Sequence, residues 1–203
     1  VLGSSVAQLW EGLLEGRSGV RRITQFDASA LDCQIAGEIP DFNVVDYMEK
    51  KVARRLARSA QISLGAATQA VQHAGLPDQM PDAERTGVVF GTAIGGLERA
   101  AEGIIQLREK GPERLNPFTV PTGIPNLSSY IIAKHFQALG PNSTITTACA
   151  TGTQVVGEGA ELIRRGGADV VITGGTEALI QDFAIAGFCA MRALPTNYND
   201  DPT

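Results

Sequence analysis

The chain has 203 residues, of which 43% are hydrophobic and 19% charged, and its formal net charge is -5. This composition excludes a disordered, highly charged chain and predicts a closely packed globular protein, most simply one compact α/β unit. The modest acidic excess argues against nucleic acid or an anionic membrane as a partner.

The cysteines are three in number and widely spaced, at Cys33, Cys149 and Cys189. They form neither a disulfide framework nor a CxxC metal knuckle, so we expect a reducing compartment and no metal site. No apolar run reaches the roughly 18 residues of a membrane helix, and no signal-peptide pattern opens the chain. The sequence therefore predicts a soluble, untargeted protein. It also looks like a piece of a longer chain.

The first elements are predicted from apolar spacing and from capping residues. A helix is expected over residues 6–14, where apolar residues share one face and Ser5 with Gln8 forms a capping box. A short strand is expected within 32–39. After a loop, one long helix is expected over 47–74, ended by a glycine and a proline.

The middle of the chain alternates strands and helices. Residues 86–90 form a compact apolar strand that leads through a glycine-rich turn into a helix over 97–110. A proline-rich loop covers 111–125, and a helix over 126–137 follows it. Residues 143–147 read as a β-branched strand.

The same alternation continues toward the end of the chain. A helix is expected over 151–165, a buried strand over 169–173 and a last helix over 177–186. Strands and helices in this order imply right-handed crossovers and a largely parallel sheet covered on both faces.

Cys149 stands at the junction between the strand over 143–147 and the helix that follows it. A helix N-terminus favours a thiolate, and its unpaired N–H groups can hold an oxyanion that forms on a thioester carbonyl. The small neighbours Ala148, Ala150 and Gly152 leave room for an acyl chain, in the manner of a nucleophile elbow. Judged without context, a cysteine in a tight turn is more often a packing residue. We assign Cys33 and Cys189 to packing.

A family resemblance supplies that context. The segments Thr147-Ala148-Cys149-Ala150-Thr151-Gly152 and Gly174-Gly175-Thr176-Glu177-Ala178 resemble those of the β-ketoacyl-[acyl-carrier-protein] synthases. Further segments fall in that family's order: Leu9-Trp10, Gly16-Arg17-Ser18-Gly19-Val20, Phe26-Asp27, Gly91-Thr92 with Gly95-Gly96-Leu97, Asn116-Pro117-Phe118 with Val120-Pro121, Leu139-Gly140-Pro141 and Arg192-Ala193-Leu194. The resemblance covers essentially the whole chain. It implies a thiolase-like layered α/β fold (αβαβα), of which residues 1–203 are the N-terminal half of the duplicated core.

The implied activity is that of an elongating condensing enzyme of fatty-acid synthesis. Cys149 would take an acyl group from acyl carrier protein, and the carbanion from decarboxylating malonyl carrier protein would attack the resulting thioester. The resemblance implies no cofactor beyond the phosphopantetheine of the carrier, a homodimer, and a cytoplasmic or plastid-stromal location. The alternatives are a polyketide ketosynthase and a non-catalytic subunit of the same fold that binds carrier protein. Such subunits generally lack a cysteine at this position.

The family completes its site with two histidines, a lysine and a glycine-rich loop from its C-terminal half. The histidines of this chain, His73 and His135, match neither position, and we expect both to be structural or solvent-facing. We therefore expect the chain alone to be unstable or prone to aggregate and unable to complete condensation.

Basic residues concentrate in one stretch, and at helical spacing Lys51, Arg54, Arg55 and Arg58 share a face. A solvated helix face explains this pattern as well as a binding surface does. The resemblance favours the surface, because the stretch corresponds to the region where condensing enzymes dock their acidic carrier protein.

Two further residues are assigned to the acyl pocket by the resemblance. Ala100 falls where side-chain size influences pocket depth, and its small side chain implies that longer chains are not blocked. Phe118 lies in the extended loop Asn116–Pro121, near the family's acyl tunnel and subunit interface.

Overall fold

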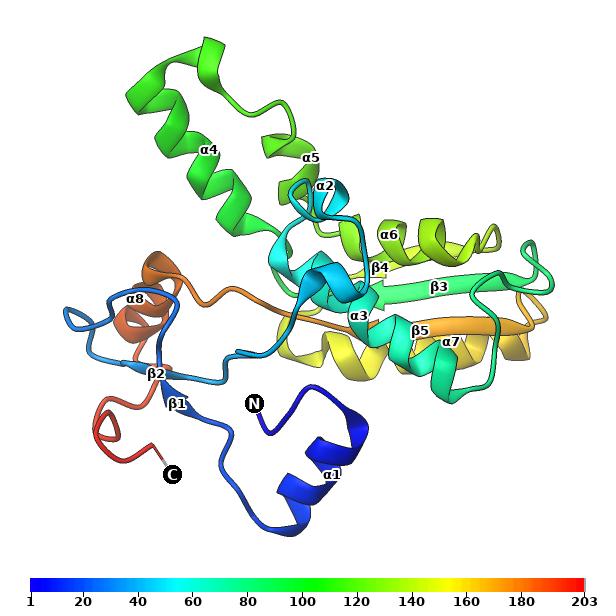
Figure 1. Ribbon diagram of the computed structural model, residues 1–203, viewed down its shortest axis with the longest axis horizontal. Coiled ribbons are helices and arrows are strands. Elements are labelled where there is room, and N and C mark those ends of the chain that lie inside the picture. Colours follow the sequence, from blue (N-terminus) through cyan, green and yellow to red (C-terminus); the bar gives the residue numbers. More distant parts are fainter. Residues whose placement is uncertain (203) are drawn as a thin grey trace. The chain divides into compact units, whose positions relative to one another are not determined.

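A computed structural model describes residues 1–202 and divides them into two units (Figure 1). Residues 43–179 form one unit, and residues 1–42 and 180–202 form the other. The contacts thus divide the chain more finely than the single compact unit expected from its composition. The second unit joins the two ends of the chain through contacts between residues far apart in sequence, such as the ion pair of Arg22 with Asp200, which no local pattern reveals.

The unit built from both ends holds a two-stranded antiparallel sheet and two helices. The elements are α1 (Val6–Leu14), β1 (Arg21–Arg22), β2 (Ile35–Ala36) and α8 (Asp182–Ala190). Its small core contains Cys33, Ile35 and Ile185. The hydroxyl of Ser5 accepts the N–H of Gln8, so the expected start of α1 is confirmed.

The last helix begins five residues later than expected, at Asp182 rather than at Glu177. The side chains of Thr176 and Glu177, which precede the helix, instead contact α3 (Arg58–His73) and the segment that follows residue 91. The Thr176 hydroxyl lies 2.8 Å from that of Ser63, and the Glu177 carboxylate accepts the N–H of Ile94 at 2.9 Å. These contacts hold the segment in an irregular conformation.

The larger unit is built on a three-stranded parallel sheet in the order β4-β3-β5. The strands are β3 (Thr86–Gly91), β4 (Asn142–Ile145) and β5 (Val170–Gly175). Every residue of the central strand β3 is buried. The predicted α/β fold with parallel strands is confirmed, and all three strands end on the same edge, where Gly91 pairs with Ile145 and with Gly175.

Helices cover both faces of this sheet (Figure 1). Val88, Phe90 and Ile172 pack in one core with α3 (Arg58–His73) and α6 (Leu127–Phe136). The odd-numbered residues of β3 and β5 face the opposite side, because side chains alternate along a strand. There α7 (Thr151–Arg164) packs so closely that a side chain at Gly159 would contact Val171 and Thr173.

The remaining elements of the larger unit are α2 (Lys50–Ala53), α4 (Leu97–Lys110), α5 (Thr119–Gly123) and the 3₁₀ turns η1 (Val44–Asp46), η2 (Pro112–Arg114) and η3 (Ala148–Ala150). Helix α5 replaces part of the loop expected to be extended. Pro121 is only its third residue, so the missing N–H is one that the first turn leaves unpaired in any case. Within residues 1–202, every helix is too short or too polar to cross a membrane.

The long helix expected over 47–74 is wrong, because residues 54–57 separate α2 from α3. Side chains from elsewhere satisfy the backbone groups that this break exposes. Glu98 accepts the N–H of Arg58 at 3.1 Å, Arg99 donates to the Leu56 carbonyl at 2.9 Å, and Gln61 donates to the Ala53 carbonyl at 2.9 Å.

Glu98 thus caps α3 from a different helix, in place of the Ala57 side chain, which cannot accept a hydrogen bond. Burial raises the pKa of the Glu98 carboxyl, although the bond from the Arg58 N–H opposes that effect. Burial also lowers the pKa of the Arg58 guanidinium.

Candidate active site

Cys149 lies in the turn η3, between the end of β4 and the start of α7. It is exposed, and its thiol is free. The expected junction of a strand and a helix is therefore confirmed, although β4 ends at Ile145, two residues earlier than predicted. A 14-residue helix begins two residues after the thiol. The partial positive charge and N–H groups of its first turn are consequently close to the sulfur.

The backbone just before Cys149 is in an uncommon conformation. Ala148 has φ 49°, in the left-handed region that residues with a side chain seldom adopt. Such a conformation costs about 1–2 kcal/mol, which the surrounding structure must supply. This reversal allows the chain to leave the strand sharply and present the next side chain, Cys149, at the surface.

The hydroxyl and the methyl group of Thr151 both make contacts that hold the turn around Cys149 in place. Its hydroxyl accepts the N–H of Thr147 at 2.8 Å, which bridges the turn that contains Cys149. Its methyl group lies against Gly91, at the end of the central strand, where any added Cβ would overlap it. Thr151 is only 4% exposed, so the turn is tied directly to the sheet.

A second network at the same edge of the sheet joins the ends of β3 and β5. Glu177 accepts hydrogen bonds from the hydroxyl of Thr92 at 3.2 Å and from the N–H of Ile94 at 2.9 Å. The Thr176 hydroxyl contacts that of Ser63 and donates to the Ser59 carbonyl at 3.2 Å. These segments carry the family resemblance, but their role in joining the strand ends was not predicted. A glutamate two residues after a strand that ends in glycines was the available signal.

Comparison with known proteins places this arrangement in a family. The family described as "Beta-ketoacyl synthase, N-terminal domain" matches residues 1–202. The chain belongs to the β-ketoacyl synthase family.

Two curated relatives show how much of a family member this chain spans. It is 44% identical over 196 residues to 3-oxoacyl-[acyl-carrier-protein] synthase 2 of Staphylococcus aureus, covering 97% of this chain and 49% of that protein. It is 39% identical to the protein of the same name from Synechocystis, covering 99% of this chain and 48% of that one. The chain thus spans about half the length of these relatives.

Solved structures agree on the fold. The ishigamide ketosynthase/chain length factor superimposes with a TM-score of 0.86 at 31% identity, covering 96% of this chain and 49% of that one. A β-ketoacyl synthase from Burkholderia phymatum superimposes with a TM-score of 0.83 at 24% identity, covering 99% of this chain and 49% of that one. The thiolase-like fold expected from the sequence is confirmed.

The basic residues of this chain do not share one helix face, so that prediction is wrong. The break over 54–57 separates them, with Lys51 in α2, Arg54 and Arg55 in the connection, and Arg58 at the start of α3. Lys51, Arg54 and Arg55 are exposed, whereas Arg58 is half-buried. Lys51 and Arg55 line one cavity of about 530 Å³.

The two residues expected in the acyl pocket line different cavities. Ala100 lines an apolar cavity of about 390 Å³ between α4 and α5. Phe118 lines the 530 Å³ cavity instead, with the Arg55 guanidinium 4.6 Å above its ring. A shared role in holding an acyl chain stays a prediction.

The remaining histidines and cysteines are solvent-facing or packed, as expected from the sequence. His73 and His135 are both exposed, and the His135 ring packs edge-on against Phe136. Cys33 is buried, and Cys189 packs against the core that contains it.

We predict that Ala148→Gly raises the free energy of unfolding by up to about 1 kcal/mol, because glycine adopts the left-handed conformation without strain. The control Ala160→Gly, in the interior of α7, should lower it by about 1 kcal/mol. Urea unfolding of both variants measures the difference. Equal destabilisation by the two substitutions would contradict the strain at Ala148.

Proposed function

We propose that Cys149 is the acyl-accepting nucleophile of a 3-oxoacyl-[acyl-carrier-protein] synthase. The observation that carries this proposal is the exposed free thiol in a sharp turn at the start of α7, which Thr151 ties to the sheet. The family membership and the relatives named 3-oxoacyl-[acyl-carrier-protein] synthase 2 support it.

In the proposed first step, the Cys149 thiolate attacks the carbonyl carbon of an acyl thioester on carrier protein. Backbone N–H groups at the start of α7 are the candidate donors for the oxyanion, although those of Ala150 and Thr151 already donate to the carbonyls of Thr147 and Ala148. Collapse of the tetrahedral intermediate breaks the bond to the phosphopantetheine sulfur, which leaves as a thiol after protonation. The acyl group then remains on Cys149.

In the second step, malonyl carrier protein loses carbon dioxide, and the resulting carbanion attacks the acyl-Cys149 carbonyl. A carbon–carbon bond forms, and the Cys149 thiolate is released. Neither step needs a cofactor bound to the enzyme, because the carrier supplies the phosphopantetheine thiol. Because this chain spans half the length of its relatives, we assign only the acyl-accepting residue to it.

The fatty-acid role is favoured over a polyketide role by the curated relatives, which share 44% and 39% identity with the chain. The similarity to a ketosynthase/chain length factor structure at 31% identity keeps the polyketide role as the alternative. A reducing compartment, either cytoplasm or plastid stroma, suits a free nucleophilic thiol.

A homodimer is also proposed, through the apolar side of α4 and α5. Ile104, Ile105 and Val120 are more than half exposed there, at 51%, 56% and 73%. Apolar side chains gathered in this way are typical of a surface that another protein covers.

We predict that incubation with saturated acyl carrier protein adds one acyl mass to the chain, and that Cys149→Ala abolishes the adduct. Intact-protein mass spectrometry measures it, and peptide mapping locates the modified residue. Cys189→Ala is the matched control, since Cys189 is also partly accessible and should leave the adduct unchanged. The Staphylococcus aureus relative serves as the positive control for the acyl donor.

An adduct that persists in Cys149→Ala would contradict the proposed role of Cys149. A folded chain that gains no acyl group, beside a relative that does, would favour the alternative of a non-catalytic subunit that binds carrier protein.

We further propose that acyl carrier protein docks on the exposed basic residues around α2, and Arg54 is the residue of choice for a test because it lines neither cavity. Arg54→Glu should raise the dissociation constant for acyl carrier protein about tenfold at low salt and weaken its dependence on ionic strength. The control Arg165→Glu changes the net charge equally on another exposed site. Calorimetric titration with acyl carrier protein over a salt series measures the dissociation constants of both variants. Equal dissociation constants for the two variants would contradict docking at Arg54.

A further inference from the structure

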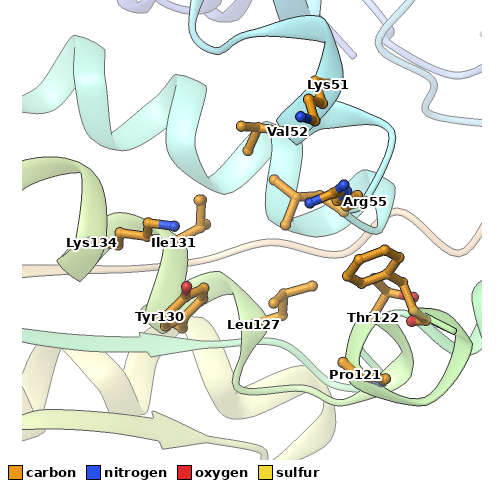
Figure 2. A pocket seen from close by; sticks show the side chains of 11 residues that line it. Lys51, Val52, Arg55, Pro121, Thr122, Leu127, Tyr130, Ile131 and Lys134 are labelled. Atoms are coloured by element: carbon orange, nitrogen blue, oxygen red, sulfur yellow. The ribbon is translucent and has the colours of Figure 1, made fainter.

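The 530 Å³ cavity beside α2 combines an apolar floor with a cationic rim (Figure 2). Val52, Leu56, Leu127 and Ile131 supply apolar lining and belong to, or pack against, the main hydrophobic core. The lining comes from α2 and the connection after it, from α5 and from α6, so the floor rests on packed elements. A cavity of this size is within the range of small-molecule sites.

Three cationic side chains surround this floor: Lys51, Arg55 and Lys134. In Figure 2 the guanidinium of Arg55 and the amine of Lys134 approach the cavity from opposite sides. Among the ion pairs of residues 1–202, none neutralises these three cations with a carboxylate.

Aromatic rings hold two of these cations instead. The Arg55 guanidinium lies 4.6 Å from the centre of the Phe118 ring, and the Lys134 amine lies 5.8 Å from that of Tyr130. Such contacts position a cation without neutralising its charge. The N–H donors of a guanidinium and an ammonium therefore stay available to an anion, and a carboxylate suits the guanidinium fork.

The two halves of the cavity define the class of ligand. An inorganic anion would use the rim and leave the apolar floor in water, whereas a neutral lipid would bury its chain and leave the cations unpaired. We propose that this cavity binds an unbranched alkyl carboxylate, with its chain on the floor and its head group between Arg55 and Lys134. The ligand would then compete with carrier protein for Lys51 and Arg55, a consequence that rests on the proposed function.

The test is calorimetric titration with decanoate, below its micelle concentration, on the Cys149→Ala chain. This background removes the acylation chemistry but leaves the cavity intact. We expect saturable one-to-one binding. Decanol lacks the charge and propanoate lacks the chain, so each should bind at least about tenfold more weakly.

Substitutions locate the site. Arg55→Leu and Lys134→Met keep apolar stems in the wall but remove the charges, and together they should weaken decanoate binding about tenfold or more. Lys50→Met is the matched control, because Lys50 is an exposed neighbour of Lys51 that does not line the cavity. Retention of the wild-type circular dichroism spectrum checks the fold of each variant.

Absence of saturable binding, or equal binding by the double variant and by Lys50→Met, would overturn the proposal. Decanol binding as tightly as decanoate would also overturn it, because the cations would then play no part. Acyl transfer is measured separately on the chain with Cys149 intact. Decanoate binding without any acyl transfer would support the cavity and count against the proposed function alone.

Discussion

The contact between Thr151 and Gly91 is the constraint on which the candidate site depends. Strand β3 is buried along its whole length, and its last residue has no side chain, so the Thr151 methyl group can lie directly on the sheet. The hydroxyl of the same residue then holds Thr147, on the other side of Cys149. One buried threonine thus couples the position of the thiol to the buried central strand of the sheet, while Cys149 itself stays exposed.

Local pattern was sufficient to predict the elements that carry this site. The apolar run at β3, the β-branched residues of β4 and the helical spacing after Thr151 each belong to one element, so the junction at Cys149 could be placed correctly. The positive φ of Ala148 could not be predicted in the same way, since alanine gives no signal for a left-handed conformation. A glycine at position 148 would have indicated a sharp turn, because glycine adopts the left-handed conformation readily.

Contacts between distant residues account for what the sequence could not show. The stretch over 47–74 has helical spacing throughout, but Glu98, Arg99 and Gln61 satisfy the groups at its break, and two of these side chains come from α4. The break moves Arg54 and Arg55 off the helix and lets Arg55 reach Phe118. The basic residues expected on one helix face are therefore divided: Arg54 is exposed and lines neither cavity, whereas Lys51 and Arg55 lie on the rim of the 530 Å³ cavity.

The central claim is that Thr151 positions Cys149 for acyl transfer, and the rate of acyl transfer to Cys149 in a Thr151→Val variant tests it most directly. Valine keeps the shape and the contact with Gly91 but cannot accept the Thr147 N–H, whereas Thr153→Val makes the same change at an exposed position of the same helix. We predict about a tenfold slower transfer for Thr151→Val and an unchanged rate for Thr153→Val, because loss of the hydrogen bond loosens the position of the nucleophile. Equal transfer rates for the two variants would contradict this account of the site.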